Sequence, residues 1–89
     1  MNKLIEKLEE YKGSTFIYYL ESDMYFANSH VHKYHYTIEG NDIRLHEEGE
    51  DELIAFRITL DSIEDINTDG ATINITFYND TNLHVDLVF

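Results

Sequence analysis

The sequence predicts an α+β fold in which an N-terminal helix packs on a curled antiparallel sheet or small open barrel of about six strands. Three ranges, 53–60, 71–78 and 83–89, place apolar residues at alternate positions, which is typical of strands with one buried face. The start of the chain instead has apolar residues at helical spacing. With 89 residues, we expect a single domain over residues 1–89 that buries roughly 60–65% of its unfolded surface.

Residues 2–12 are predicted to form the helix, because one helical face carries Leu4, Ile5, Leu8 and Tyr11. Asn2 can cap the N-terminus of this helix, and Gly13 can end it. The apolar stripe is short, so we expect the helix to dock on the sheet or across one end of it.

The first strand is predicted over residues 14–21, and residues 24–39 form either one long bent strand or two shorter strands around Asn28 and Ser29. Gly40 and Asn41 then predict a hairpin turn, since both residue types tolerate positive φ. We expect Ile43 and Leu45 to point into the core from the strand that follows.

Three strands in the second half of the chain are expected to supply most of the core. Their inward residues are Ile54, Phe56, Ile58, Leu60, Ile73, Ile75, Phe77, Leu83, Val85, Leu87 and Phe89. Residues 61–66 are predicted to form one helical turn, and turns are expected at 69–70 and 79–82. The other face of these strands is polar, so it meets solvent or a partner.

Net charge is the main indication of function. Eighteen Asp and Glu residues against six Lys and Arg give a formal charge of −12, and neither Lys nor Arg occurs after Arg57. A chain of this charge is repelled by nucleic acid and by anionic membrane surfaces. We therefore expect a basic protein as partner, with no direct binding to nucleic acid or membrane.

Several functional classes are excluded or disfavoured. The sequence has no Cys, which rules out disulfides and thiolate metal sites. It contains no apolar run near the ~20 residues of a membrane span and no signal-peptide core, so we expect a cytoplasmic protein. Gly-rich phosphate loops and nucleophile elbows are also absent from the sequence. We expect neither enzymatic activity nor a cofactor.

His30 and His32 are the candidates for a metal site, because two residues apart on a strand they project from one face. Such a site would need further ligands from a neighbouring strand, for which the sequence offers His46, Glu47, His84 and Asp86. The alternative interpretation is a half-buried histidine pair that serves packing or hydrogen bonding.

An acidic surface is the preferred candidate site, and exposed tyrosines are expected to anchor a partner beside the carboxylates. The residues expected to bind the partner are Glu47, Glu48, Glu50, Asp51, Glu52, Asp61, Glu64, Asp65, Asp69, Tyr19, Tyr25 and Tyr78. In an extended segment the backbone rises ~3.3 Å per residue, close to the ~3.4 Å charge spacing along one DNA strand. A dense acidic segment can therefore imitate nucleic acid. The alternative is a solvated, solubilising surface without a partner.

In size, charge and order of elements, the whole chain resembles the phage-encoded inhibitors that mimic nucleic acid, including the uracil-DNA glycosylase inhibitor and several anti-CRISPR proteins. The resemblance implies a non-enzymatic inhibitor of a nucleic-acid-handling protein, acting in the host cytoplasm if the chain is phage-encoded. It implies a class of partner and no individual partner.

The sequence is also compatible with two alternative functions. One is an assembly module that self-associates through a sheet edge at the final strand, where Leu87, Val88 and Phe89 carry no charge. The other is a metal-binding or ligand-binding module built on His30 and His32. The sequence is compatible with a monomer or a homodimer.

Overall fold

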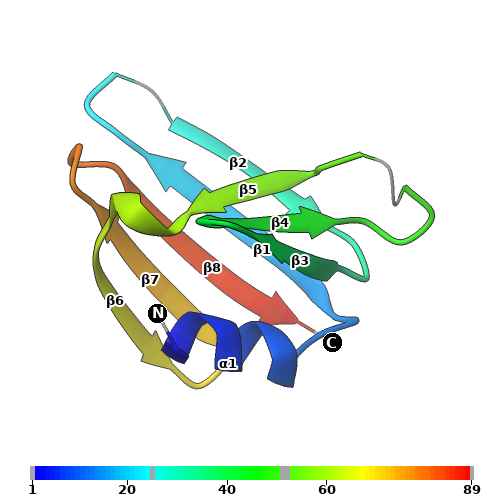
Figure 1. The fold of residues 1–89 in the computed structure, drawn as a ribbon. Helices are drawn as coiled ribbons and strands as arrows, with labels where there is room; N and C mark the ends of the chain where they lie inside the picture. The colour runs from blue at the N-terminus through cyan, green and yellow to red at the C-terminus, as the bar shows by residue number, and fades with distance from the viewer. Residues whose placement is uncertain (1, 25, 51–52, 89) are drawn as a thin grey trace.

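The structure is a computed structural model that describes residues 2–24, 26–50 and 53–88. The described residues form one α-helix, one short 3-10 turn and eight strands in two antiparallel sheets (Figure 1). The strands form two sheets, in which neighbouring strands are hydrogen-bonded. The larger has five strands in the order β2-β1-β8-β7-β6, and the smaller has three in the order β3-β4-β5. The bounds are α1 Asn2–Glu10, β1 Thr15–Glu21, β2 Phe26–Val31, β3 His35–Glu39, β4 Asp42–His46, β5 Phe56–Thr59, η1 Leu60–Ser62, β6 Ile63–Asp69, β7 Thr72–Phe77 and β8 Asn82–Val88.

The predicted α+β class is confirmed, but the strand arrangement differs from the prediction. Eight strands form among the described residues where about six were expected, and they make two separate sheets without closing into a barrel. Helix α1 and the three-stranded sheet lie on the same side of the five-stranded sheet (Figure 1). The core between these layers consists of Leu4, Leu8, Phe16, Val31, Tyr34, Ile43, Leu45, Ile58, Ile73, Ile75, Leu83, Val85 and Leu87.

An aromatic cluster joins the two sheets. The ring of Tyr18 on β1 stacks on that of Phe56 on β5, with centroids 4.3 Å apart. Phe16, which is fully buried, lies 5.8 Å from Tyr34 and 5.9 Å from Phe56 between ring centroids. Edge and offset contacts of this kind add to the hydrophobic gain from burial. The cluster therefore holds the three-stranded sheet against the five-stranded one.

The predicted N-terminal helix forms but ends at Glu10, two residues earlier than expected, with Leu4 and Leu8 fully buried and Gly13 at φ +94° in the turn that follows. This φ lies in the left-handed region that glycine adopts without strain. The Gly13 N–H donates to the carbonyl of Tyr34 at 2.9 Å, and the Tyr34 N–H donates to Ser14 at 2.9 Å. These two bonds tie the end of the helix to the segment that leads into β3.

The region 24–39 forms two strands, as one of the two predicted alternatives, but the break is not at Asn28 and Ser29. Both of these residues lie inside β2, and the chain turns at 32–34, where Lys33 adopts φ +48°. The turn changes which residues face the core, because Val31 and Tyr34 are both buried although three positions apart. Alternating polarity alone could not locate this change, since His, Lys and Tyr are all compatible with an exposed strand.

The strand predicted over 53–60 is shorter than expected, and the segment after it has a different conformation. Strand β5 begins at Phe56, while Leu53 and Ile54 precede it and are 63% and 45% exposed, so Ile54 is not an inward residue. The helical turn predicted at 61–66 is also wrong. The 3-10 turn η1 ends at Ser62, and β6 follows it with Ile63 and Ile66 packed against the core.

The predicted hairpins are confirmed. Gly40 and Gly70 both adopt φ +60° at the tips of the β3–β4 and β6–β7 hairpins, which pair Glu39 with Asp42 and Asp69 with Thr72. Ile43 is fully buried on β4, as expected. In the last hairpin Asp80 adopts φ +64°, a conformation that Asp tolerates better than most side chains do.

The final strand is not an edge. Strand β8 pairs with β1 on one side and with β7 on the other, so it is the middle strand of the five-stranded sheet. The edges of this sheet are β2 and β6, and those of the smaller sheet are β3 and β5. The predicted self-association through the free edge of the last strand therefore has no structural basis.

Candidate functional site

The surface that offers most for recognition is the side of the five-stranded sheet that faces away from helix α1 and the three-stranded sheet. We call it the outer face. Its outward residues alternate with the buried core positions. They are Thr15, Ile17, Tyr19, Glu21, Phe26, Asn28, His30, Asp65, Asn67, Asp69, Thr72, Asn74, Thr76, Asn82, His84, Asp86 and Val88. No residue of this set is buried.

The antiparallel register sets the outward residues in rows across the sheet. The middle row runs through all five strands and consists of Asn28, Tyr19, His84, Asn74 and Asn67. Within it, the ring centroids of Tyr19 and His84 are 5.8 Å apart, and His84 Nδ1 is 2.7 Å from Asn74 Oδ1. The centre of the outer face is therefore an aromatic and amide platform rather than a purely charged one.

Asp86 provides the charge nearest to this centre. Its Oδ1 accepts a hydrogen bond from Thr72 at 3.1 Å and lies 3.3 Å from His84 Nε2. His84 thus faces an oxygen atom on each of its ring nitrogens, which fixes its orientation on β8. A partner that approaches the centre meets a carboxylate, an imidazole and the Tyr19 ring at positions held by neighbouring side chains.

Charge is segregated between the two layers. The five strands of the larger sheet contain neither Lys nor Arg, whereas their carboxylates are Glu21, Glu64, Asp65, Asp69 and Asp86. All six cations lie elsewhere, on helix α1, in the turns at residues 12 and 33, and on β4 and β5. In the described part of the chain, no ion pair involves Glu21, Asp65 or Asp69.

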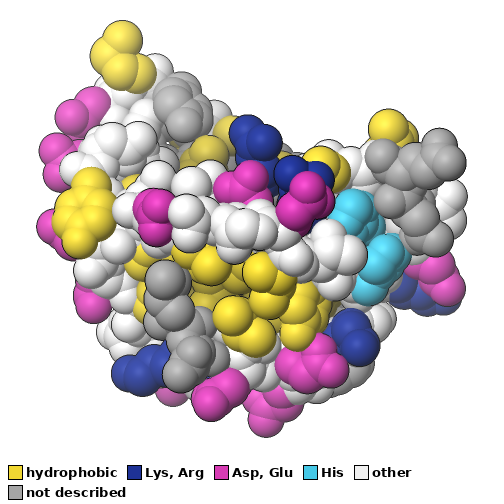
Figure 2. All heavy atoms as spheres, viewed as in Figure 1, with side chains coloured by type: hydrophobic (Ala, Val, Ile, Leu, Met, Phe, Trp, Pro, Cys, Tyr) yellow, Lys and Arg dark blue, Asp and Glu magenta, His cyan; other side chains and the backbone are white. Residues whose placement is uncertain are grey.

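The opposite side of the molecule has a different character. Figure 2 shows this side, with helix α1 and the three-stranded sheet toward the viewer, and Lys and Arg side chains interspersed with Asp and Glu. Arg44, for example, pairs with Glu39 at 2.9 Å between Nη1 and Oε2. Mixed charges partly cancel at a distance, so the outer face is the more uniformly negative of the two.

Two shallow hollows lie on the outer face and share Tyr19 as a wall. The larger, of about 430 Å³, lies over β1 and β2 and is lined by Thr15, Ile17, Tyr19, Asn28, Ser29, His30 and His32. The smaller, of about 130 Å³, lies over β1, β7 and β8 and is lined by Tyr19, Glu21, Asn74, Ile75, Thr76, Asn82, Leu83 and His84. Tyr19 is 39% exposed, so its ring is available to a partner from either hollow.

The predicted pair His30 and His32 is brought together in the larger hollow, and His32 Nδ1 lies 3.3 Å from Thr15 Oγ1. Of the ligands suggested to complete a metal site, Glu47 accepts from the backbone N–H of His32 at 2.9 Å, and the others lie on different strands. His46 is buried on β4, where its ring stacks on His35, and His84 is on β8. Among the described residues, no group of three or more His, Asp or Glu side chains is placed to hold a metal ion.

The acidic residues predicted to bind a partner fall into two groups that the fold separates. Glu64, Asp65 and Asp69 are exposed on β6, with Asp61 in η1 just before it, while Glu48 and Glu50 are exposed between β4 and β5. These two regions lie at opposite ends of the view in Figure 1. Tyr19 is on β1 and Tyr78, 69% exposed, is in the β7–β8 turn. Tyr25, Asp51 and Glu52 lie outside the described residues.

Contacts within the fold engage three of the predicted carboxylates. Glu47 accepts a hydrogen bond from the backbone N–H of His32 at 2.9 Å, and Glu48 pairs with Lys33 at 3.5 Å. Asp61 accepts from the side-chain amide of Asn41 at 2.7 Å. These side chains brace turns, so the β6 carboxylates are the better candidates for a partner.

The candidate site also includes residues that the sequence did not indicate as binding a partner: Glu21, Phe26, Asn28 and Asn74, together with His84 and Asp86, which were named only as possible metal ligands. A signal for them was present, because Asn74, His84 and Asp86 are polar members of alternating strands. Alternation identified a polar face on each strand. It could not reveal that β1 and β2 would add their outward residues to the same face.

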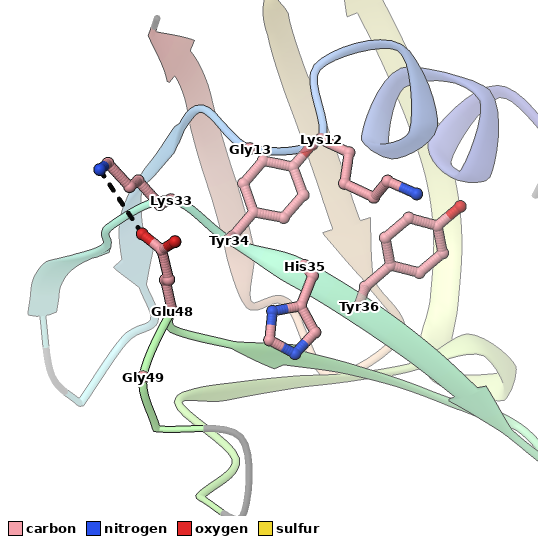
Figure 3. Close-up of a pocket in the computed structure, with 8 residues that line it drawn as sticks. All are labelled: Lys12, Gly13, Lys33, Tyr34, His35, Tyr36, Glu48 and Gly49. Carbon is pink, nitrogen blue, oxygen red and sulfur yellow. Dashed lines mark ion pairs between the residues drawn. The ribbon is translucent and has the colours of Figure 1, made fainter.

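A separate hollow of about 680 Å³ lies on the other side of the molecule, between the end of helix α1, β3 and the segment after β4 (Figure 3). It is lined by Lys12, Gly13, Lys33, Tyr34, His35, Tyr36, Glu48 and Gly49. Both of its lysines are paired with carboxylates, Lys12 with Glu9 at 3.4 Å and Lys33 with Glu48 at 3.5 Å. Neither cation is left without an anion, which makes this hollow a weaker candidate site than the outer face.

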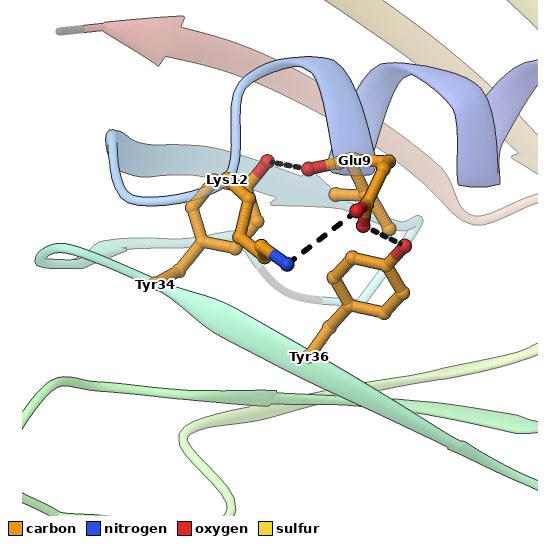
Figure 4. A network of polar contacts seen from close by, with 5 residues as sticks. Glu9, Lys12, Tyr34 and Tyr36 are labelled. Atoms are coloured by element: carbon orange, nitrogen blue, oxygen red, sulfur yellow. Dashed lines mark hydrogen bonds and ion pairs between the residues drawn. The ribbon is translucent and has the colours of Figure 1, made fainter.

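Two tyrosines at this hollow connect helix α1 to β3 and the turn before it (Figure 4). The Tyr34 hydroxyl donates to the carbonyl of Leu8 at 2.6 Å, and the Tyr36 hydroxyl donates to Glu9 Oε2 at 2.6 Å. Burial raises the pKa of Tyr36 to about 12, with the hydrogen bond to Glu9 and its charge adding to the effect. Burial also raises the pKa of Tyr34, while the bond from Tyr36 lowers the pKa of Glu9.

These shifts predict a loss of stability in alkali. The folded state holds the protonated phenols more strongly than the unfolded state does, so their contribution is complete below pH 10 and is lost as pH rises through about 12. Thermal unfolding followed with tyrosinate absorbance should show a midpoint that falls steeply above pH 10. We expect Tyr36→Phe to reduce this slope and Tyr19→Phe, on the exposed outer face, to leave it unchanged. An equal slope in both variants would contradict the assignment of this loss of stability to the Tyr36 phenol.

Comparison of this chain with protein-family models, curated proteins and solved structures finds no match in any of the three. None of the helices formed by the described residues has the length and apolar character needed to cross a membrane. The candidate site therefore depends on geometry and charge alone.

Proposed function

We propose that this protein is a non-enzymatic inhibitor that binds a basic, nucleic-acid-handling protein through the outer face of its five-stranded sheet. The observation that carries the proposal is the distribution of the cations: the five strands carry five carboxylates and neither Lys nor Arg, and all six cations lie on helix α1, in the turns at residues 12 and 33, and on β4 and β5. The carboxylates of this sheet are not offset by cations on the same strands, so the face presents charge of a single sign to a partner. Such a face favours the cationic groove of a protein that binds nucleic acid.

The carboxylates and the aromatic side chains of the outer face would contribute to different steps of binding. Asp65 and Asp69 lie at the β6 edge of the outer face, where they can steer the encounter with a cationic partner. Tyr19 and Phe26, the latter 58% exposed, lie on the other half of the sheet and can contribute apolar contact once the partner is bound. Charge would set the association rate, and the aromatic rings would set the lifetime of the complex.

The nature of the partner rests on physical chemistry and on the resemblance to phage-encoded inhibitors. A surface that mimics nucleic acid competes for the same basic groove, and its binding weakens as salt screens the charges. Action in the cytoplasm, including a host cytoplasm for a phage-encoded chain, follows from that class of partner. The proposal includes anti-CRISPR activity as one form of such inhibition.

Charge reversal on the outer face tests this function. Capture from a cell lysate at low and high salt would first identify the partner, and duplex DNA should compete for it. We then expect Asp65→Lys with Asp69→Lys to slow association by at least about tenfold, because steering accelerates association by roughly 10–10³-fold. The thermal midpoint should change little, since both side chains are exposed.

The matched control makes an equal change in net charge, at residues that lie away from the outer face. Glu6→Lys with Glu50→Lys alters exposed residues of helix α1 and of the segment after β4, and should leave the association rate much closer to that of the original protein. Equal slowing by both pairs would mean that only the total charge matters. Unchanged association in the Asp65 and Asp69 variant would refute binding through this face.

A further inference from the structure

The four edge strands of the two sheets differ in how they are protected against pairing with another chain. Natural proteins guard exposed edges with charges, bulges or proline. Strand β3 contains Glu39, β5 contains Arg57, and β6 contains three carboxylates and an irregular register at its start. Strand β2, with the sequence Phe-Ala-Asn-Ser-His-Val, has no charged residue, and its register with β1 is regular throughout.

The backbone of β2 is open to a further strand. The N–H of His32 donates to Glu47 at 2.9 Å, and its carbonyl accepts from the N–H of Glu48 at 3.4 Å, so the backbone groups of His32 point away from β1. Because these directions alternate along a strand, those of His30 and Asn28 point to the same open side. In the described part of the chain, no hydrogen bond from another segment reaches the backbone of either residue.

Side chains do not cover this edge either. Every residue of β2 from Phe26 to His30 is exposed, and only Val31 at its end is buried. Phe26, 58% exposed, and His30 lie on the outer face on either side of Asn28. An apolar and a polar aromatic side chain flanking a central Asn form a pattern that can complement its own copy when the strand is turned by 180°.

Electrostatics favours β2 over β6 as the edge at which a second acidic copy can approach, because β2 itself carries no carboxylate and β6 carries three. In the order β2-β1-β8-β7-β6, the carboxylates of β6 lie four strands away, or roughly 19 Å at ~4.8 Å per strand. This distance exceeds the Debye length of ~8 Å at physiological ionic strength. Other carboxylates lie nearer to β2. Glu21 on β1 is at the end that pairs with Phe26. Glu47 and Glu48 contact the backbone of His32 just beyond the other end, where Glu48 also pairs with Lys33.

We propose that β2 pairs antiparallel with β2 of a second copy of this chain, so that two five-stranded sheets join into one continuous sheet of ten strands. The outward-pointing backbone groups fix the register. Asn28 lies on the two-fold axis opposite Asn28 of the partner subunit, and Phe26 lies opposite His30 of the partner subunit. The two outer faces then become a single surface. This inference is independent of the function proposed above.

Sedimentation measurements over a range of protein concentrations test the association. The apparent mass should rise from 10.5 kDa toward twice that value, and salt should strengthen the dimer because both copies carry a charge of −12. Binding of a basic partner has the opposite salt dependence, which separates the two proposals. A protein that stays monomeric at every concentration and salt level would overturn the inference. The loss of a different protein partner in a β2 variant would not restore it.

Two substitutions at the axis test the edge itself. Asn28→Pro removes an N–H on the open side, a position where an edge strand tolerates proline, and should abolish the dimer. Asn28→Asp is nearly isosteric, places two like charges opposite each other, and should weaken the dimer several-fold with partial recovery in salt. Asn67→Asp on β6 is the matched control and should have no such effect. A dimer that survives both Asn28 changes would place the interface elsewhere.

Crosslinking tests the register. The chain has no cysteine, so Asn28→Cys introduces a single thiol. Residues opposite each other in a hydrogen-bonded antiparallel pair have Cα atoms ~5.5 Å apart, within the range of disulfides. We expect rapid oxidation of the Asn28→Cys protein to a covalent dimer and slow, concentration-limited oxidation of the exposed control Asn67→Cys. Equal rates for the two variants would overturn the proposed register.

Discussion

Replacing Phe16 with Ala is expected to lower the free energy of unfolding by about 3–5 kcal/mol, the usual cost of truncating a buried Phe. Phe16 is fully buried on β1, and its ring lies within 6.1 Å of the rings of Tyr18, Tyr34 and Phe56 between centroids. The cavity would open where the two sheets meet. Because a chain of 89 residues has a total stability of only roughly 4–13 kcal/mol, the thermal midpoint should fall by on the order of 10–40 °C.

The control for this variant is the same substitution one strand away. Phe26 on β2 is 58% exposed and lies on the outer face, so Phe26→Ala should change the free energy of unfolding by no more than ~0.5 kcal/mol in the monomer. Chemical denaturation of both variants at low protein concentration measures the difference. A Phe16→Ala protein as stable as Phe26→Ala would mean that the aromatic cluster does not hold the two sheets together.

Predictions made from local pattern agree best with the structure where the pattern is long or the turn residue has a specific backbone requirement. Helix α1 was predictable from Leu4 and Leu8 on one stripe, and the hairpins at Gly40 and Gly70 from residues that tolerate positive φ. The alternation in β7 and β8 also located the core residues Ile73 and Val85. Each of these features is decided by neighbours along the chain.

Predictions that depended on distant neighbours were less successful. Strand β6 has the sequence Ile-Glu-Asp-Ile-Asn-Thr-Asp, in which Ile63 and Ile66 are three positions apart, and this spacing suggested a helical turn. The segment forms a strand because it pairs with β7, and the shift in register between Ile63 and Asp65 accommodates the odd spacing. A bulge combined with tertiary pairing leaves no regular period in the sequence.

The candidate site was predictable in kind and less so in position. The excess of carboxylates was evident from the sequence, and Tyr19 was expected to be exposed, but strand order decides which carboxylates share a face. Glu47 and Glu48 belong to the densest run of acidic residues in the sequence, yet in the fold they contact the backbone of His32 and the side chain of Lys33. Charge density along the chain is therefore a poor guide to charge on a surface.

The position of β8 leads to the second large effect, and His84→Pro is expected to prevent stable folding. Strand β8 has a hydrogen-bonded neighbour on each side, so every backbone N–H in its middle serves the ladder. A proline there removes one bond and leaves a carbonyl unsatisfied, at a cost of roughly 1–3 kcal/mol, and its ring adds a steric conflict. That total consumes much of the stability of this domain.

Three variants distinguish a central strand from an edge in one experiment. His84→Ala keeps the backbone N–H and should remain folded, and Asn28→Pro on the open side of β2 should remain folded as a monomer. His84→Pro alone should lose amide dispersion in the NMR spectrum and the cooperative unfolding transition. If His84→Pro were as stable as Asn28→Pro, β8 could not lie between β1 and β7, and the outer face described above would not exist as one continuous surface.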